Sequence, residues 1–457
     1  MGSRGSYMER SAMAQLESWR SAANRKPLIV KGARQVGKTE LLKEFGRRYF
    51  DNVAYISLER HDAETPSEYA ELFERTRDPR RVITNLSLAA GVPIQPGSTL
   101  LILDEIQDCE AAVNSLKYFA EDLPELHVAC AGSLLGIALT SGDRSFPVGK
   151  VSFMDLQPMS FSEFLGAIGD GALAEYCAQI DVLESVPLVF ATRLEDALKL
   201  YFATGGMPES VDAWRSTGDI AAVNAVLTDL LDSYERDFAK HGGRFMYAKV
   251  SAVWWSLPSQ LARENKKFVY GVIREGARAR EYEDAIVWLK NAGLVRRVFR
   301  STEPGIPVSA YDDLSSFKLY CLDVGLLRRL SRLDATAFAV AGNLFAEFKG
   351  AFAENYVLQA LGPQMDSPLR YWSITKPAHE VDFLMQVGNQ VLPVEVKSGE
   401  NTKSASLRYY TQKYGDKTPL RVRFSLLNLS LDGNLLNVPL WLADEGKRLA
   451  ELALAKQ

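Results

Sequence analysis

The sequence has no large excess of charge of either sign. Its 457 residues contain 53 Lys and Arg and 57 Asp and Glu, which gives a formal net charge of −4. A chain that binds nucleic acid over its whole surface would be strongly basic, so this class is excluded and any nucleic-acid surface must be local. Long apolar runs are missing as well, and none approaches the roughly 20 residues that cross a bilayer. We therefore expect no membrane partner.

Cysteine is scarce, and its spacing matches no disulfide framework and no zinc site. The N-terminus has no recognisable secretory signal, because Met1–Tyr7 resembles an expression-tag remnant and Met8 is the expected native start. The sequence therefore favours a reducing, cytoplasmic setting. The four cysteines are Cys109, Cys130, Cys177 and Cys321.

One stretch matches the phosphate-binding pattern G-x-x-x-x-G-K-[ST] at every fixed position. The apolar run Pro27–Val30 precedes it and predicts a buried strand, while Thr39–Tyr49 follows it and predicts a helix whose N-terminal dipole faces an anion. Strand, loop and helix therefore follow one another in the order that a nucleotide site needs. The alternative is an ordinary glycine-rich turn, which does not require this order. The loop residues are Gly32, Ala33, Arg34, Gln35, Val36, Gly37, Lys38 and Thr39.

The residue types of this loop suit a polyphosphate. Its glycines allow the turn that exposes backbone N–H groups. Lys38 supplies a point charge for the β and γ phosphates, and the Thr39 hydroxyl can bind Mg²⁺. The sequence therefore predicts a nucleotide site that uses Mg²⁺.

A second element completes the predicted phosphate site. Thr99–Leu103 is a continuous apolar run, typical of a buried parallel strand, and it ends in Asp104 and Glu105. Ligands of doubly wound sheets bind beyond the carboxyl ends of such strands. Asp104 can there hold the hydration shell of Mg²⁺, and Glu105 can deprotonate an attacking water. The alternative is a strand that simply ends in solvated acids.

Two further strands are predicted, at Tyr55–Leu58 and at His127–Ala131, and the second runs into Gly132 and Ser133. Ser133 either contacts a γ phosphate as a sensor or caps the following helix, and the two roles are compatible. Strands that alternate with helices favour a parallel sheet. The first third of the chain is therefore predicted to be α/β.

Three motifs together, Gly32–Thr39, Leu103–Gln107 and Ala131–Leu135, resemble the AAA-type ATPases of the archaeal-ATPase-like group (AAA_14) that carry a C-terminal DUF4143 region. The resemblance implies ATP and Mg²⁺ as cofactors, an ATPase core of the P-loop (ASCE/AAA) type, a helical middle, a winged-helix-like segment and a nuclease-like end. We also expect a homo-oligomeric ring. Further matching segments are Gln157–Leu165, Gly205–Glu209, Leu257–Leu261, Trp288–Leu294 and Phe317–Leu327.

The chain departs from this pattern after the sensor strand, where relatives often carry Gly-Arg and this chain has Gly149 and Lys150. An arginine finger from a neighbouring subunit stabilises transition-state charge, and lysine cannot make the same two-pronged contact with phosphate. Arg144 in the same loop is the substitute candidate. For Arg144 and Lys150 alike, the alternative is a solvated loop charge.

The middle of the chain is predicted to be helical, and residues 247–335 are predicted to be winged-helix-like. The helix Glu283–Lys290, followed by the strand-like runs Leu294–Phe299 and Phe317–Tyr320, supports the second prediction. A cluster of arginines there either contacts DNA phosphates or forms a solvated surface, because acidic residues interleave with it. These arginines are Arg274, Arg278, Arg280, Arg296, Arg297 and Arg300.

The last quarter contains two strand-like runs, 380–386 and 391–397, and Gly388 opens the two-residue turn between them. A turn of this length fixes the register of a hairpin. It places Asp382 opposite Glu395, and both side chains on one face of the hairpin.

Two carboxylates directly opposite each other repel. A divalent cation bound between them would make the arrangement favourable. The spacing of Asp382, Glu395 and Lys397 resembles the PD-(D/E)xK nucleases, in which Mg²⁺ or Mn²⁺ lies between the acids and the lysine acts on a water or on the cleaved phosphate. A helix that contains Glu354 matches the extra acid of that superfamily. The resemblance implies a DNA nuclease, although such folds also serve as modules that bind DNA or protein without cleavage. The structural alternative is a surface hairpin with a Glu380–Lys397 pair.

The predicted fold class is α/β, with a P-loop parallel sheet first and a restriction-endonuclease-like domain last. The composition, 47% hydrophobic and 24% charged, is that of a globular chain, and 457 residues divide into several cores. The predicted parts are the tag remnant with an N-terminal helix (1–20), the ATPase core (21–155), a helical lid or linker (156–246), the winged-helix-like segment (247–335) and the nuclease-like domain (336–457).

Overall fold

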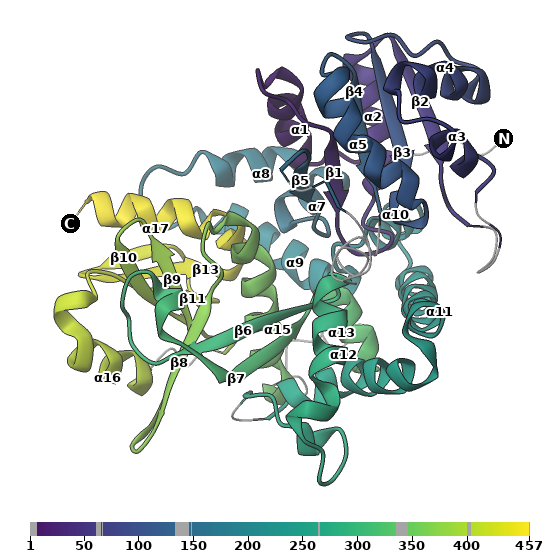
Figure 1. Ribbon diagram of the computed structural model, residues 1–457. Coiled ribbons are helices and arrows are strands. Elements are labelled where there is room, and N and C mark those ends of the chain that lie inside the picture. Colours follow the sequence, from purple (N-terminus) through teal and green to yellow (C-terminus); the bar gives the residue numbers. More distant parts are fainter. Residues whose placement is uncertain are drawn as a thin grey trace. The chain divides into compact units, whose positions relative to one another are not determined.

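A computed structural model describes residues 7–60, 65, 67–132, 146–147, 149–263, 266–334, 346–399 and 404–456. The chain divides into two compact units, and Figure 1 shows the helices and strands of both. The first unit comprises Met1–Gln157 with Asn291–Leu294. The second comprises Pro158–Lys290 with Val295–Gln457.

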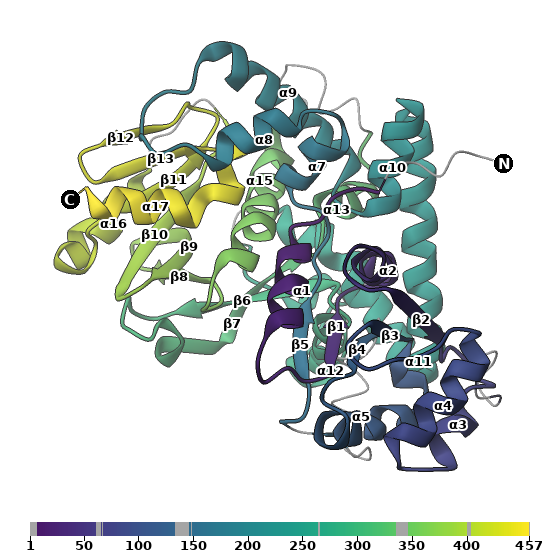
Figure 2. The ribbon, with the colours of Figure 1, turned by 90° about the horizontal axis from the view of Figure 1, so that it is seen from above.

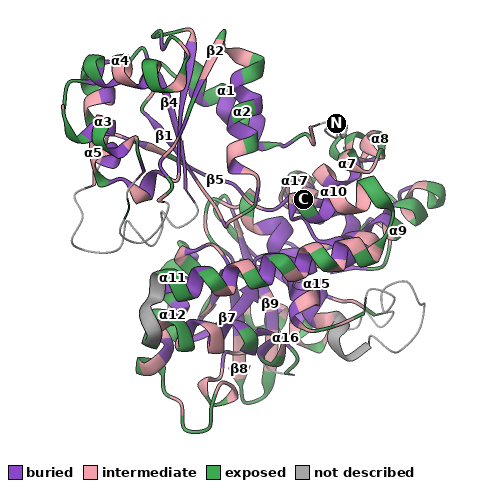
Figure 3. Ribbon diagram, turned by 90° about the vertical axis from the view of Figure 1, so that its right-hand side faces the viewer, coloured by how far each residue is buried: buried purple, intermediate pink, exposed green. Residues whose placement is uncertain are grey.

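The first unit is built on a five-stranded parallel sheet with the order β2-β3-β4-β1-β5. Continuous apolar runs form its centre, because β3 and β4 are buried along their whole length (Figure 3). The parallel sheet predicted for this part is thereby confirmed. The strands are β1 (Leu28–Lys31), β2 (Asn52–Ser57), β3 (Thr99–Asp104), β4 (His127–Ala131) and β5 (Ser152–Asp155).

Helices of the first unit pack on this sheet through their apolar sides. Buried side chains of α3, α4 and α5 share one hydrophobic core with side chains of β1 to β4. This core fixes the sheet, and with it the strand ends that carry the predicted site. The helices are α1 (Ala12–Ser21), α2 (Lys38–Tyr49), α3 (Ala70–Glu74), α4 (Pro79–Ala90) and α5 (Glu110–Asp122).

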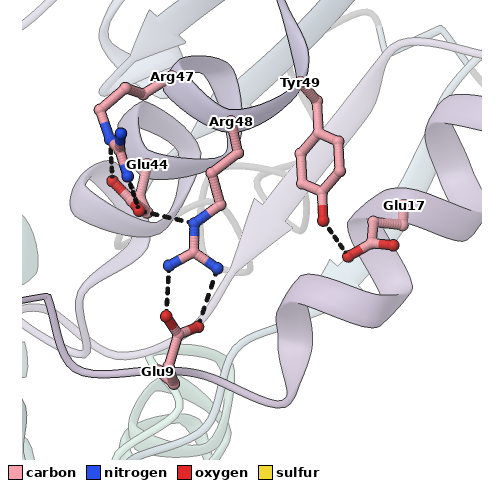
Figure 4. A network of polar contacts seen from close by, with 6 residues as sticks. All are labelled: Glu9, Glu17, Glu44, Arg47, Arg48 and Tyr49. Carbon is pink, nitrogen blue, oxygen red and sulfur yellow. Dashed lines mark hydrogen bonds and ion pairs between the residues drawn. The ribbon is translucent and has the colours of Figure 1, made fainter.

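Arg48 of α2 ties the segment before α1 to that helix (Figure 4). Glu44 accepts hydrogen bonds at 2.7 Å from Nε of Arg47 and from Nε of Arg48. Arg48 also donates to Glu9, with 3.0 Å between Nη1 and Oε2. Hydrogen bonds from Arg47 and Arg48 lower the pKa of Glu44 to about 2. The N-terminal segment is therefore anchored to the helix that follows the phosphate loop.

The second unit begins with helices, as predicted. The longest, α11, has 42 residues (Figure 2). It runs through the boundary predicted between residues 246 and 247, so the segments on either side share one helix. Neither α11 nor any other helix in the described part of the chain is long and apolar enough to cross a membrane. The helices are α7 (Phe161–Ala167), α8 (Gly171–Ala178), α9 (Leu188–Thr204), α10 (Pro208–Thr217), α11 (Ile220–Leu261), α12 (Ala279–Asn291) and α13 (Val324–Leu330).

A mixed eight-stranded sheet completes the second unit, with the order β12-β13-β11-β10-β9-β8-β6-β7. The ribbon predicted for a winged helix, β6 and β7, forms one edge of this sheet, because β6 also pairs in parallel with β8. The ribbon is thus part of the C-terminal sheet and not the wing of a separate domain. The strands are β6 (Val295–Ser301), β7 (Asp312–Cys321), β8 (Arg370–Thr375), β9 (Ala378–Val387), β10 (Gln390–Val396), β11 (Arg421–Ser425), β12 (Ser430–Asp432) and β13 (Leu435–Pro439).

Three more helices pack against strands of this sheet. The last of them, α17, contacts β13 and β9, and Figure 2 shows it beside these strands. One of them, α15, carries the helical acid predicted for the nuclease-like pattern. The helices are α15 (Ala346–Leu361), α16 (Ala405–Tyr414) and α17 (Gly446–Ala455).

The hairpin of β9 and β10 has the predicted register. Val387 pairs with Gln390 next to the turn, and the pairing continues to Phe383 opposite Val394. Gly388 has a φ of +54°, the left-handed conformation that favours glycine in such a turn. The predicted register is therefore confirmed up to one residue before the two acids.

Candidate nucleotide site and a buried carboxylate cluster

The phosphate loop leaves β1 and enters α2 through residues with positive φ. Gly32, Gln35 and Gly37 have φ angles of +147°, +64° and +92°. A Cβ atom at position 32 would lie 2.3 Å from the carbonyl oxygen of Leu156, so only glycine fits there. Helix α2 then begins at Lys38. Its first N–H groups have no partner within the helix, and they can bind an anion.

Lys38 is buried, and its ammonium group lies against the loop. Nζ donates to the carbonyl oxygens of Gly32 at 3.0 Å and Ala33 at 2.8 Å. Burial lowers the pKa of Lys38 to about 8, although Glu105 and Asp104 oppose the shift. A bound anion would favour the protonated lysine further. The lysine charge is thus held at the loop, where a polyphosphate would bind.

Thr39 and Asp104 meet, although they lie far apart in the sequence. The Thr39 hydroxyl donates to Asp104 Oδ2 at 2.8 Å, and Asp104 Oδ1 accepts from the backbone N–H of Glu105 at 3.0 Å. A hydroxyl beside a carboxylate fits Mg²⁺, which keeps several waters and takes phosphate oxygens as further ligands. Within the described ranges, no group of three or more His, Cys, Asp or Glu is placed to hold a metal ion.

Glu105 has an unusual backbone conformation. Its φ is +48° and its ψ is +43°, a left-handed region that few residues other than glycine occupy. Oε2 of Glu105 accepts from Gln107 Nε2 at 2.5 Å. Backbone strain of this kind concentrates at functional sites. The Glu105 carboxylate thus contacts Gln107 while that of Asp104 contacts Thr39, which suits two different roles.

Two residues that sequence reasoning missed contact this site. Tyr55 of β2 donates its hydroxyl to Asp104 Oδ2 at 2.9 Å, and burial raises the pKa of this tyrosine. Arg10 precedes α1, and its Nη1 donates to the carbonyl of Val36 in the loop at 3.0 Å. Tyr55 reaches the site because β2 is the neighbour of β3, where it pairs with Ile102. That neighbour relation is a property of the sheet, and no local pattern marks Arg10.

The residues predicted for a nuclease-like site come together in the second unit. Lys397 Nζ lies 2.6 Å from Glu395 Oε1. Asp382 Oδ2 accepts from the backbone N–H of Val396 at 2.8 Å. Burial, together with the charges of Glu354 and Glu395, raises the pKa of Asp382 well above its usual range. Glu354, Asp382, Glu395 and Lys397 are therefore close enough to interact.

The hairpin is not the surface hairpin considered from the sequence. Glu380 pairs with Lys318 at 2.5 Å, in place of a pair with Lys397. Glu395 is only 4% exposed. The acids of the hairpin thus belong to a largely buried polar cluster, in which Glu380 and Asp382 are partly exposed.

Two further lysines, which no local pattern marks, belong to this cluster. Lys318 of β7 is fully buried, and its Nζ lies 3.9 Å from Glu354 Oε2. Lys266 pairs with the same glutamate. Burial by itself lowers the pKa of Lys318, but Tyr320, Glu380 and Glu354 raise it well above its usual value. The carboxylates therefore have cationic partners from the protein itself.

Three stretches of the chain match models of known families. Residues 24–165 match an AAA domain. The first unit carries an AAA domain of the P-loop ATPase type. Residues 349–442 match a domain of unknown function (DUF4143), and residues 195–337 match another (DUF8612). The predicted AAA and DUF4143 regions are thereby confirmed. No curated protein matches the chain.

Several solved structures resemble the chain at low identity. A Walker-type ATPase of Pyrococcus abyssi is 15% identical over 72% of this chain and 97% of its own, with a TM-score of 0.45. The ORC2 protein of Aeropyrum pernix is 12% identical over 73% of this chain and 96% of its own, with a TM-score of 0.35. The ORC1 protein of Aeropyrum pernix in complex with DNA is 15% identical over 73% and 95%, with a TM-score of 0.29. Scores at this level carry no argument about function.

Two residues predicted for the AAA domain, Ser133 and Arg144, lie outside the described residues. Lys150, the other finger candidate, is described. Its Nζ lies 2.8 Å from Glu121 Oε1, and both side chains are partly exposed. This ion pair fits the interpretation of Lys150 as a solvated loop charge. To act on a neighbouring subunit, Lys150 would have to break its contact with Glu121.

Acidic partners neutralise three of the six arginines predicted to contact DNA. Burial lowers the pKa of a fourth, Arg296, to about 10. Arg278 and Arg280 are exposed. The cluster therefore offers less free positive charge than its sequence indicates. The ion pairs are Arg274–Glu281, Arg297–Glu283 and Arg300–Asp313.

Proposed function

We propose that this chain is an ATP-hydrolysing AAA-type ATPase that works as a homo-oligomeric ring. The observation that supports it most is the hydrogen bond between Thr39 and Asp104 beside the buried ammonium group of Lys38. These groups suit a nucleoside triphosphate bound with Mg²⁺. Release of phosphate from ATP by the full chain tests the proposal, and a chain that releases none with Mg²⁺ present would overturn it.

Each group of the site has a role in this proposal. The backbone N–H groups of the loop and Lys38 bind the β and γ phosphates. Thr39 and Asp104 orient the hydrated Mg²⁺, whose charge offsets that of the phosphates. Glu105 takes the proton of the attacking water. Ser133, which follows β4 in the sequence, senses the γ phosphate.

A neighbouring subunit completes the site in this proposal. Transition-state charge on the transferred phosphoryl group is stabilised by a cation supplied in trans. Arg144 and Lys150 are the two candidates. Arg144 is the better donor chemically, because its planar guanidinium binds two phosphate oxygens at once.

Loss of the Tyr55 hydroxyl is expected to weaken the use of Mg²⁺. Tyr55→Phe keeps the ring, 3.8 Å from the ammonium of Lys43, and removes one of the two side-chain donors to Asp104 Oδ2. A hydrogen bond to a charged group contributes about 1.5–3 kcal/mol, and exposure of Tyr55 reduces that figure. We expect the Mg²⁺ concentration for half-maximal ATP turnover to rise about three- to tenfold, by titration of steady-state rates.

The control for this variant is Tyr118→Phe on α5. Both variants are expected to keep the parental melting temperature to within a few degrees, about the effect of 1 kcal/mol or less. An unchanged Mg²⁺ titration in Tyr55→Phe would show that the hydroxyl does not position Asp104.

For the C-terminal domain we propose a docking role, in which it binds DNA or a protein partner without cleavage and the ATPase acts as a switch. The pairing of its carboxylates with lysines supports this proposal. The rival is a metal-dependent nuclease in which Asp382 and Glu395 hold Mg²⁺ or Mn²⁺, Lys397 acts on the water or the cleaved phosphate, and Glu354 assists.

Labelled DNA incubated with the full chain and Mg²⁺ or Mn²⁺ is expected to stay intact on a denaturing gel. The parental chain should match Asp382→Ala and Lys397→Ala, because lysines of the chain itself neutralise these acids. Cleavage by the parental chain that both variants abolish would establish the nuclease instead. Anisotropy of the same DNA, with ATP and with ADP, distinguishes a DNA partner from a protein partner.

A further inference from the structure

The buried carboxylate cluster of the second unit contains its own cations. Lys318 is fully buried on β7, and the Lys266 side chain is only 15% exposed. A charged group that is removed from water needs compensation by protein groups. Here three lysines meet four acids. The cluster comprises Glu354, Glu380, Asp382, Glu395, Lys266, Lys318 and Lys397.

The oxygens of Glu354 are already engaged. Oε1 contacts Lys266. Oε2 accepts from the Tyr320 hydroxyl at 3.1 Å and lies 3.9 Å from Lys318 Nζ. A divalent cation needs about six oxygen ligands at about 2.0–2.6 Å, including carboxylates free to turn toward it. Glu354 therefore does not fit a metal ion while both lysines are in place.

Each of the two acids of the hairpin has one oxygen that a group of the protein already engages. Asp382 Oδ2 accepts from the N–H of Val396, and Glu395 Oε1 pairs with Lys397. Oε2 of Glu395 is buried and has no hydrogen-bond partner. The net charge of the cluster also argues against a metal ion. Three ammonium groups neutralise three of the four carboxylates, so only one negative charge is left. A divalent ion added to this set would reverse the sign of the buried charge.

We propose that Lys318 and Lys266 are built-in cations that occupy the place of a divalent metal, so that the cluster keeps a nuclease-like geometry without a metal ion. Both lysines come from outside the hairpin, Lys318 from the edge strand β7 and Lys266 from the segment after α11. The cluster thereby joins the edge ribbon to the centre of the sheet. This inference goes beyond the docking role, which concerns what the domain binds.

Mn²⁺ binding by the full chain without nucleotide tests this inference, with electron paramagnetic resonance as the readout. The parental chain and Glu395→Gln are expected to bind Mn²⁺ equally, because the cluster contributes no site. Lys318→Met removes the charge and nearly keeps the length of the side chain. It is expected to add one Mn²⁺ site at least tenfold tighter than any in the parental chain, and Glu395→Gln in the same chain should remove that site.

Lys413→Met is the matched control, because it removes an exposed lysine of α16 and should add no site. If Lys318→Met does not fold, as judged by circular dichroism, Lys266→Gln at the less buried position gives the same test. A parental Mn²⁺ site that Glu395→Gln abolishes would overturn the inference. A folded variant of either lysine that gains no site would also overturn it. The docking role fails by a different result, DNA cleavage, so the two failures can be told apart.

Discussion

Replacement of Lys38 by alanine is expected to lower ATP turnover by at least about a hundredfold. The structure holds this ammonium group in the loop, where it donates to the carbonyl oxygens of Gly32 and Ala33. Bound phosphate oxygens would replace those carbonyls as partners and gain a preorganised charge. Loss of one preorganised group of this kind costs about 10²–10³ in rate, or about 3–4 kcal/mol. Steady-state phosphate release gives the rate, and binding of a fluorescent ATP analogue shows how much of the loss is affinity.

The matched control is Lys117→Ala, which removes an exposed lysine from α5. It should turn over ATP at the parental rate. Because Lys38 is buried, the melting temperature of Lys38→Ala must be measured as well, so that a folding defect is not taken for a catalytic one. A folded Lys38→Ala that hydrolyses ATP at the parental rate would refute the nucleotide site.

Glu105→Gln is expected to separate ATP binding from ATP hydrolysis. The amide keeps the shape of the side chain and its contact with Gln107, but it cannot take a proton from water. General-base catalysis contributes about 10²–10⁴ in rate. We therefore expect turnover to fall by that factor while the affinity for ATP changes less than about threefold. The variant should then accumulate with ATP bound.

Light scattering of Glu105→Gln with ATP, with ADP and without nucleotide gives the oligomeric state of that trapped form. A larger assembly with ATP than without is expected, because a neighbouring subunit is proposed to complete the site. Glu110→Gln, an exposed acid at the start of α5, is the control. Parental turnover in Glu105→Gln would place the general base elsewhere, and a monomer in all three states would argue against a cation supplied in trans.

The conformation of the loop and the register of the hairpin were predictable because their information is local. The loop pattern requires glycine at positions 32 and 37, and both glycines have positive φ angles. An apolar strand that ends in acids places Asp104 at the carboxyl edge of a parallel sheet. The two-residue turn at Gly388 determined the register of β9 and β10 in the same way. Each prediction needed only neighbours in the sequence.

Contacts that depend on which strands are neighbours were not predictable. Tyr55 reaches Asp104 because β2 lies beside β3. Lys318 of β7 reaches Glu380 of β9 although β6 and β8 lie between these strands in the sheet. The pairing of β6 with β8 joins residues that are about 70 positions apart, since Arg300 pairs with Tyr371. The sequence shows two short ribbons there, and only the folded chain shows that they share a sheet.

The position of β6 and β7 in that sheet limits how the protein can be divided for expression. A fragment that starts at residue 336, the predicted domain boundary, lacks both strands and leaves β8 as an open edge. Open edges pair with other chains and promote aggregation. Such a fragment would also lack Lys318 and leave Glu380 without its partner. A fragment that begins at Pro158 keeps all eight strands together.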